Sequence, residues 1–337
     1  MQTLFRCFVL GWLAFLVGCS NNASPQPSAG KPARIAMLPK LMGVSFFDAT
    51  GRGAKEAAAE LGVELTYDGP TEARSEDQIR MIDGWVAQGF QVIAVAPNDP
   101  DGVAKTLRDA KDAGATVVTW DTDATPETSQ RTIFVNQAEA SAIGFALVDV
   151  MAEGIQARGG DLAGDYLVVS GTATASNQNV WLEMMRKRIA EKYPQMNIVK
   201  VLYPGEDQQK AQEQTAAEVG ANSHLKGIWG LTSVSLPAAA KVVRDAGTAK
   251  ETFVTGLSLP SLMREYVKDE TVDAFVLFDP VALGYLTVQV AHRAAQEELQ
   301  PGTYDFGRIK NVEIRDGMAI MGPPLVFNRE NIDDFDF

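Results

Sequence analysis

Two aspartates follow a short apolar run in the middle of the chain, where Val117–Trp120 leads directly into Asp121 and, two residues later, Asp123. A carboxylate at the end of a buried strand can attack a phosphate ester, and the spacing Asp-x-Asp-x-Thr up to Thr125 suits that chemistry. The same carboxylate can instead accept hydrogen bonds from the hydroxyl groups of a sugar. A third interpretation is an acidic turn without a ligand.

Polar residues also stand at the ends of other predicted strands. Lys40, for example, follows the first predicted strand in a loop that is otherwise apolar. In open parallel sheets, ligands bind outside the carboxyl ends of the strands. These polar side chains are therefore candidates for one shared ligand site. They are Lys40, Asp68, Asn98, Asp121, Ser170 and Ser258.

Two further segments carry side chains suited to a polyhydroxylated ligand. Asn177, Gln178 and Asn179 stand at the start of a predicted helix, where amides are good caps. Amides also both donate and accept hydrogen bonds, as sugar hydroxyls do. Phe46 and Phe47 in the first loop either belong to the core or present a ring to the apolar face of a sugar. For the amides, helix capping and ligand binding both stay open, and for the phenylalanines, core packing and ligand contact both stay open.

Motifs for catalysis or nucleotide binding are weak. Gly51 and Gly53 come about a dozen residues after the first strand and lack the third glycine of a dinucleotide fingerprint, so we interpret them as helix-start glycines. His224 and His292 stand apart from any nucleophile or metal-ligand pattern. We expect no catalytic residue, no cofactor and no metal site.

The phosphatase interpretation has requirements that the chain does not meet. The nucleophile strand should open its domain, whereas Asp121 ends the fourth predicted strand. A tight acidic pair should follow a later strand, but Asp333 and Asp334 lie in the tail. We therefore predict a protein that is not an enzyme, and keep a phosphatase using Asp121 and Asp123 as a less favoured alternative.

The acidic charge balance argues against a nucleic-acid partner. The chain has 337 residues with 43 acidic and 30 basic side chains, a formal net charge of −13. Binding to nucleic acid depends on clustered Lys and Arg, and the sequence contains no basic stripe. We therefore predict no nucleic-acid partner.

Strands and helices alternate from residue 34 onward. Strands separated by single helices require parallel pairing with right-handed crossovers, and a length prior of roughly 150 residues per domain favours two domains. We predict a fold of two doubly wound parallel-sheet α/β lobes joined by a hinge. The N-terminal lobe would comprise 33–123 plus 280–310, and the C-terminal lobe 124–279 plus 311–337. The predicted strands are 34–38, 63–67, 92–96, 115–120, 166–170, 197–203, 226–231, 252–256 and 272–278.

The N-terminus has the pattern of a targeting segment. An apolar run at 7–17 is too short to span a bilayer, and the Leu-Val-Gly-Cys sequence at 16–19 resembles the lipobox of bacterial lipoproteins. This resemblance implies a signal peptide at 1–18 and acylation of Cys19, which would hold the protein at a membrane by lipid alone. Residues 19–32 are rich in Pro and Ser, which is typical of a tether.

Several segments match one family of binding proteins. The first strand and loop at 34–47 and the strand end at 119–123 look like those of the autoinducer-2-binding periplasmic proteins. Asn177–Asn179 and the segment 256–260 are nearer to the related rhamnose-binding proteins. The similarity covers residues 33–337. It implies two α/β lobes of the periplasmic binding protein type I, joined by crossing segments, that close on a small sugar-like ligand.

The resemblance also implies a set of ligand-binding residues. The ligand lysine of the family falls on Lys40, and its key aspartate falls on Asp121. The next pair in the family is Asp-Gln, and in this chain it is Asn177-Gln178. Replacing a carboxylate by Asn177 removes a charge and adds a donor.

Two pocket positions of the family differ in this chain. A proline and an alanine are replaced by Leu231, which is bulkier, and Ser233, which adds a hydroxyl. These changes leave the exact ligand open between autoinducer-2, rhamnose and another sugar. Phe278 and Asp279 resemble the lobe-crossing segment of the family, where an aromatic ring and an acid or amide line the cleft.

We therefore predict a monomeric substrate-binding component of an ABC importer that passes its ligand to the permease and ATPase subunits. Asp121 and Asp279 would accept hydrogen bonds from hydroxyls, and Lys40 would donate. Asn177 and Gln178 would bridge from the other lobe. The remaining candidates are Phe46, Phe47, Asn98, Leu231, Ser233 and Phe278. A protein that presents the same cleft to a chemoreceptor or sensor kinase is the alternative.

Overall fold

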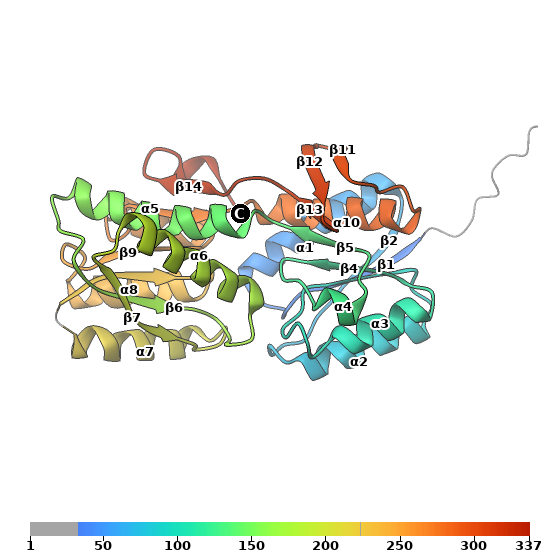
Figure 1. Ribbon diagram of the computed structural model, residues 1–337, viewed down its shortest axis with the longest axis horizontal. Helices are drawn as coiled ribbons and strands as arrows, with labels where there is room; N and C mark the ends of the chain where they lie inside the picture. Colours follow the sequence, from blue (N-terminus) through green and yellow to red (C-terminus); the bar gives the residue numbers. More distant parts are fainter. Residues whose placement is uncertain (1–32, 223) are drawn as a thin grey trace, which may run out of the picture. The chain divides into compact units, whose positions relative to one another are not determined.

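The computed structural model describes residues 33–222 and 224–337, which form two α/β lobes (Figure 1). The predicted signal peptide, the Cys19 lipidation site and the tether at 19–32 lie outside the described residues. The prediction of two lobes with parallel sheets is confirmed by the strand order.

The N-terminal lobe is built on an eight-stranded sheet in the order β11-β12-β13-β5-β4-β3-β1-β2. Alternate residues of its inner strands serve opposite faces: Ile35 and Met37 of β1 pack in one apolar cluster, and Ala36 and Leu38 in another. Because both faces are covered, these strands are mostly apolar. The strands are β1 Arg34–Leu38, β2 Glu64–Tyr67, β3 Val92–Val95, β4 Thr116–Trp120, β5 Ile133–Asn136, β11 Gly302–Phe306, β12 Ile309–Arg315 and β13 Met318–Ile320. The helices are α1 Ser45–Leu61, α2 Ser75–Ala87, α3 Ala104–Asp112, α4 Pro126–Ser129 and α10 Pro280–Ala295.

The C-terminal lobe has a four-stranded parallel sheet in the order β7-β6-β8-β9. A single bridge between Leu257 and Val276 places the antiparallel pair β10–β14 beside β9. The strands are β6 Gly164–Val169, β7 Met196–Leu202, β8 Leu225–Gly230, β9 Phe253–Gly256, β10 Ala274–Leu277 and β14 Leu325–Asn328. The helices are α5 Ala140–Ala157, α6 Ser176–Lys192, α7 Gln208–Ala221, α8 Ser235–Ala246, α9 Pro260–Lys268 and the short η1 Ile332–Asp334.

Helix α5 is apolar because it is a core helix. By length and composition alone it could cross a membrane, with a mean hydropathy of 1.3 over 18 residues. Its buried side chains, such as Ile143, Leu147 and Met151, instead pack in the core, where α5 contacts α6, β9 and β10.

Strand pairing corrects the predicted lobe boundaries. β5 pairs with β4 and β13 pairs with β5, so both strands belong to the N-terminal sheet. The assignment of 124–136 and 311–320 to the C-terminal lobe is therefore wrong. The sequence analysis placed the lobe boundary at the acidic turn after β4. Hydrogen bonds between β4 and β5 extend the N-terminal sheet beyond this turn. The chain thus crosses between lobes after β5, after β10 and after β13.

Beside the predicted parallel strands, the structure has antiparallel strands that the sequence analysis did not predict. β11, β12 and β13 form an antiparallel meander, and β10 pairs with β14 in antiparallel fashion. These short edge strands have mixed exposure, and their sequences lack the buried apolar run that marks the inner strands.

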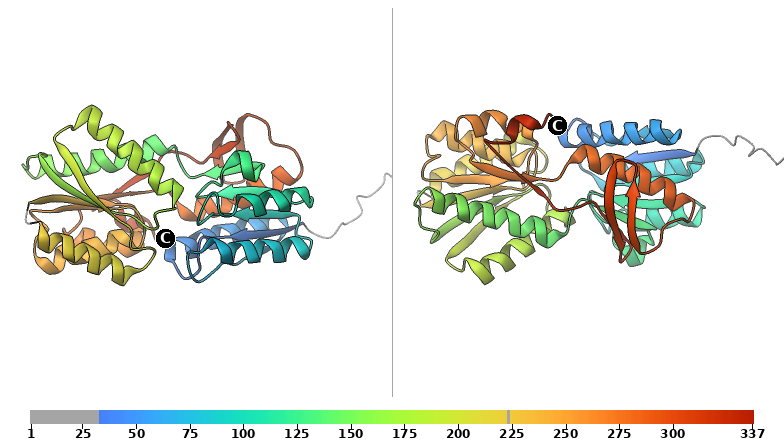
Figure 2. Two further views of the ribbon diagram at one scale, coloured as in Figure 1. Left: turned by 60° about the horizontal axis from the view of Figure 1, so that its bottom comes forward. Right: turned by 90° about the horizontal axis from the view of Figure 1, so that it is seen from above.

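Helices α1 and α10 lie side by side on one face of the N-terminal sheet (Figure 2, blue and orange). A Cβ atom on Gly53 would lie 1.8 Å from the backbone oxygen of Val281, and one on Gly284 would lie 1.8 Å from that of Thr50. The two backbones therefore meet directly. Gly51 and Gly53 lie inside α1 rather than at its start, and Gly53 permits this helix contact.

Candidate functional site: the cleft between the lobes

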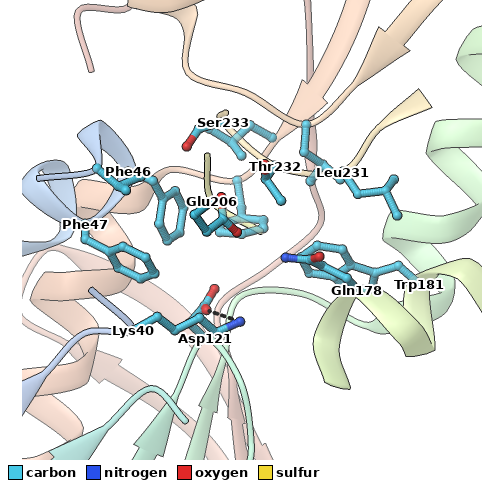
Figure 3. Close-up of a pocket in the computed structure, with 14 residues that line it drawn as sticks. Lys40, Phe46, Phe47, Asp121, Gln178, Trp181, Glu206, Leu231, Thr232 and Ser233 are labelled. Carbon is cyan, nitrogen blue, oxygen red and sulfur yellow. Dashed lines mark ion pairs between the residues drawn. The ribbon is translucent and has the colours of Figure 1, made fainter. Parts of the chain in front are cut away.

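A cavity of about 50 Å³ lies between the two lobes, with side chains from both in its wall (Figure 3). At about 10–15 Å³ for each water, it has room for roughly four water molecules. The predicted site residues that line it are Lys40, Phe46, Phe47, Asp121, Gln178, Leu231, Ser233 and Phe278. Its other lining residues are Val44, Trp181, Glu206, Thr232, Leu257 and Leu277, which the sequence analysis missed.

Asp121 enters the cavity through a strained turn at the end of β4. Its φ is +59°, in the left-handed region, and the N–H of Thr122 donates to the carbonyl oxygen of Trp120 at 2.6 Å. A three-residue turn with positive φ at its centre is rare, although Asp tolerates this conformation better than most residues. The turn stops the strand and directs a carboxylate that is 4% exposed into the cleft.

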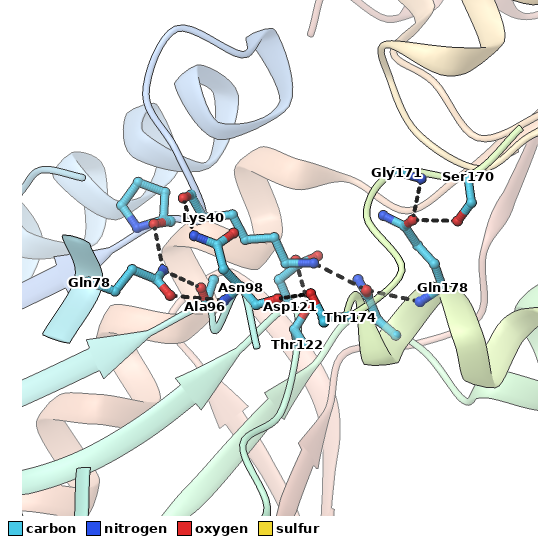
Figure 4. Close-up of polar contacts among 12 residues, drawn as sticks. Lys40, Gln78, Ala96, Asn98, Asp121, Thr122, Ser170, Gly171, Thr174 and Gln178 are labelled. Carbon is cyan, nitrogen blue, oxygen red and sulfur yellow. Dashed lines mark hydrogen bonds and ion pairs between the residues drawn. The ribbon is translucent and has the colours of Figure 1, made fainter. Parts of the chain in front are cut away.

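Lys40 and Asp121 form a buried ion pair. The Lys40 Nζ lies 3.6 Å from Asp121 Oδ2 and donates to Asn177 Oδ1 of the other lobe at 3.2 Å (Figure 4). Burial raises the pKa of the Asp121 carboxyl, and the charge of Lys40 opposes that rise. The pair therefore offers a donor and an acceptor that are already desolvated.

Asn98 supports this pair from behind and does not line the cavity. Its Nδ2 donates to the backbone oxygen of Lys40 at 2.8 Å, and its own backbone N–H donates to Gln78 Oε1 at 2.9 Å. Its carbonyl oxygen accepts a hydrogen bond from Thr174 Oγ1 at 3.0 Å, across the cleft. Asn98 thus holds the loop that carries Lys40.

The neighbours of Gln178 determine the orientation of its amide. Its Oε1 accepts hydrogen bonds from Ser170 Oγ and from the Gly171 N–H, both at 2.7 Å. The NH₂ group faces the cavity as a donor, beside the carboxyl group of Glu206 (Figure 3). Asn177 accepts from the Gln178 N–H at 2.9 Å as well as from Lys40, so its side chain joins the first turn of α6 to the other lobe.

Aromatic side chains form the apolar wall of the cavity. Phe46 packs edge to face with Phe47 and Phe278 at centroid distances of 5.2 and 5.8 Å, and Phe47 packs on Trp120 at 6.0 Å. Phe46 and Phe47 lie in the first turn of α1 rather than in a loop, and they are nearly buried, as the core interpretation expects. Both also line the cavity, and contact of their rings with a sugar stays a prediction.

Two aspartates of the sequence analysis are engaged elsewhere. Asp279 caps α10, with its Oδ1 accepting from the Ala282 N–H at 3.0 Å, and it does not line the cavity. Asp123 accepts two hydrogen bonds from Arg131, at 2.7 and 2.6 Å. Asp123 therefore stabilises the turn after β4, which agrees with its interpretation as turn chemistry.

Glu206 is the most prominent residue that the sequence analysis missed. It lies in the loop between β7 and α7, and burial raises the pKa of its carboxyl to about 7. The signal was present, because the rule that polar residues beyond strand ends form the site applies equally to the loop after β7. Within the described residues 33–222 and 224–337, no group of three or more His, Cys, Asp or Glu side chains is placed to hold a metal.

Comparisons with known proteins agree with this architecture. Residues 35–299 match the family model of the periplasmic binding protein domain. A D-ribose/D-allose-binding protein of Pseudomonas aeruginosa is 24% identical over 275 residues, which cover 76% of this chain and 81% of that protein.

Two solved structures are similar over almost the whole chain. LsrB from Clostridium saccharobutylicum in complex with AI-2 is 26% identical, with a TM-score of 0.86, and the match covers 90% of this chain and 100% of that one. An ABC transporter solute binding protein from Clostridium phytofermentas with bound L-rhamnose is 30% identical, with a TM-score of 0.81 and coverage of 90% and 98%. The chain belongs to the periplasmic binding protein domain family, the non-enzymatic solute-binding proteins of sugar ABC transporters.

Proposed function

We propose that this protein captures a small, neutral, polyhydroxylated ligand, such as autoinducer-2 or a rhamnose-type sugar, between its two lobes. One observation carries the proposal: the Lys40–Asp121 pair of one lobe and the Gln178 amide of the other face a single cavity with an aromatic wall. Ligand sites of this kind combine an apolar lining with a few precisely placed polar groups.

Each side chain has a definite part in binding. Asp121 accepts hydrogen bonds from ligand hydroxyls, and Lys40 donates to a ring or hydroxyl oxygen. Gln178 donates from the opposite lobe, and the hydroxyl of Ser233 is a further partner. Phe46 covers the apolar face of the ligand. Because these groups come from both lobes, the ligand contacts more of them in the closed state and so favours closure.

Three similar proteins support this ligand class. One of them has AI-2 bound and another L-rhamnose, and a third is named for D-ribose and D-allose. Leu231 and Ser233 line the same cavity and would set the fit to one ligand within the class.

The rest of the proposal concerns the cellular context. The protein would be anchored by lipid on Cys19 at the periplasmic face of a membrane, act as a monomer and deliver its ligand to an ABC permease and ATPase. The same cleft presented to a chemoreceptor or sensor kinase is the second candidate. Loss of ligand uptake on deletion of the gene favours transport, and loss of a response with uptake intact favours sensing.

The test is calorimetric titration of the purified protein with autoinducer-2, L-rhamnose, D-ribose and D-allose. We expect one of them to bind, and Asp121→Ala to weaken that binding about 10- to 100-fold, since a hydrogen bond to a charged group contributes about 1.5–3 kcal/mol. Asp68→Ala is the matched control, because Asp68 ends β2 at an exposed position outside the cavity. Binding of none of the four, or equal affinity in both variants, would contradict the proposal.

A further inference from the structure

Glu206 lies across the cavity from the ion pair of the other lobe (Figure 3). Of the cavity-lining residues in the described chain, Lys40 alone is basic, and its ammonium group already pairs with Asp121. The carboxyl group of Glu206 therefore lacks a cation of its own. The function proposed above does not use it.

The surroundings of Glu206 hold its carboxyl group inside the cleft. A Cβ atom on Gly171 would lie 2.6 Å from Glu206 Oε1 and 3.0 Å from Gln178 Oε1, so the carboxyl group packs against this glycine beside the Gln178 amide. Thr232, two residues after β8, lies beside the same carboxyl group. Glu206 and the donor that Gln178 offers to a ligand thus share one side of the cavity.

We propose that Glu206 is a further ligand-contacting residue that takes up a proton when the lobes close on a neutral ligand. This inference rests on the proposed function. With Lys40 and Asp121 compensating each other, an ionised Glu206 would leave one uncompensated negative charge in a cavity emptied of water, which is costly. A protonated carboxyl group avoids that cost and offers one donor and one acceptor, the pattern of a sugar hydroxyl.

The charged groups around Glu206 agree with proton uptake. Burial is the main effect that raises the pKa of its carboxyl to about 7, and the negative charge of Asp121 adds to the rise. The charge of Lys40 and hydrogen bonds with Thr232 and Gln178 act in the opposite direction. Separation of the lobes would return Glu206 to water, where glutamate titrates near pH 4.3, so closure itself would shift its titration.

The sign of the pH effect follows from this shift. The pKa is higher in the closed, ligand-bound state, so binding is strongest below the ordinary pKa of glutamate. It weakens as the pH rises from about 4 to about 7 and levels off above that range. Between about pH 6 and about pH 8 the affinity should fall about tenfold.

The experiment titrates the protein with autoinducer-2, L-rhamnose, D-ribose and D-allose at about pH 6 and about pH 8, in buffers of low and high ionisation enthalpy. For the ligand that binds, we expect about tenfold weaker affinity at the higher pH and a binding enthalpy at neutral pH that depends on the buffer, the signature of proton uptake. Glu206→Gln, which mimics the protonated group, should bind with nearly constant affinity over this range. Glu213→Gln, exposed on α7, should keep the full pH dependence.

The outcomes separate the two proposals. Binding with no buffer dependence, or the same pH dependence in Glu206→Gln, would overturn the role of Glu206 and leave the proposed function standing. Failure of the wild-type protein to bind any of the four ligands at either pH would overturn the proposed function and this inference with it. The buffer measurement needs only the wild-type protein, so the test stands even if Glu206→Gln does not fold.

Discussion

At the scale of single residues, the cleft depends on side chains whose orientation is fixed by neighbours that do not line the cavity. Asn98 holds the backbone of Lys40, and Ser170 and Gly171 occupy the amide oxygen of Gln178. Such support removes rotational freedom before the ligand arrives, so less entropy is lost on binding.

Gln178 provides a test of this orientation. In Gln178→Glu, one carboxylate oxygen can still accept from Ser170 and Gly171, but the donor that faces the cavity becomes an acceptor and a negative charge is added. Ligand affinity should fall by up to about tenfold, since a net hydrogen bond contributes about 0.5–1.5 kcal/mol. Calorimetric titration would measure the affinity, and thermal unfolding would show whether the variant is still folded.

The control for Gln178 adds the same charge elsewhere. Gln209→Glu, at an exposed position on α7, should leave the affinity unchanged. If Gln178→Glu bound as tightly as the wild-type protein, the amide would not face the ligand as we propose.

At the scale of elements, the N-terminal lobe relies on the contact between α1 and α10. α10 begins directly after the crossing from the C-terminal lobe, so its packing on α1 fixes one end of the hinge. Gly53 and Gly284 allow the helices to approach until backbone meets backbone.

Gly284→Ala should therefore destabilise the protein although alanine favours helices. The added methyl group would meet the Thr50 carbonyl at 1.8 Å, and overpacking of this kind costs about 1–3 kcal/mol or more. Gly220→Ala is the matched control, because Gly220 lies in α7 with nothing within 4 Å of a new Cβ, and it should stabilise by about 0.5–1 kcal/mol. Equal free energies of unfolding for the two variants, measured in urea, would contradict the close-contact explanation.

At the scale of the whole molecule, two hydrogen bonds join the lobes beside the cavity. They run from Lys40 to Asn177 and from Thr174 to the carbonyl of Asn98. Thr174 does not line the cavity, so its hydroxyl acts on the balance between open and closed lobes rather than on the ligand.

Thr174→Val should weaken ligand binding a few-fold, because one net hydrogen bond of about 0.5–1.5 kcal/mol is lost from the closed state alone. Thr174→Ser keeps the hydroxyl and should bind like the wild-type protein. The dissociation constants, and the decrease in the radius of gyration on ligand addition measured by X-ray scattering, test this. Equal affinity of the Val and Ser variants would show that the bond does not favour closure.

The sequence alone predicted the inner strands of both sheets and several of the residues that line the cavity. Nearly continuous apolar runs identified the inner strands of both sheets, because a strand buried on both faces has few polar positions. The strand-end rule then selected Lys40 and Asp121, since the carboxyl ends of parallel strands share one edge whatever the details of packing.

Only the tertiary structure decided which polar residues face the cavity. Asn98, Asp123 and Asp279 satisfy the same sequence rule as Asp121, yet their side chains form hydrogen bonds with the backbone or with Arg131. Glu206, which the sequence analysis missed, lines the cavity. The antiparallel strands β11 to β13 and the lobe boundaries also depended on pairing between distant segments. A residue type states which bonds a side chain can make, whereas the partners that arrive from elsewhere in the chain determine which bonds are left for a ligand.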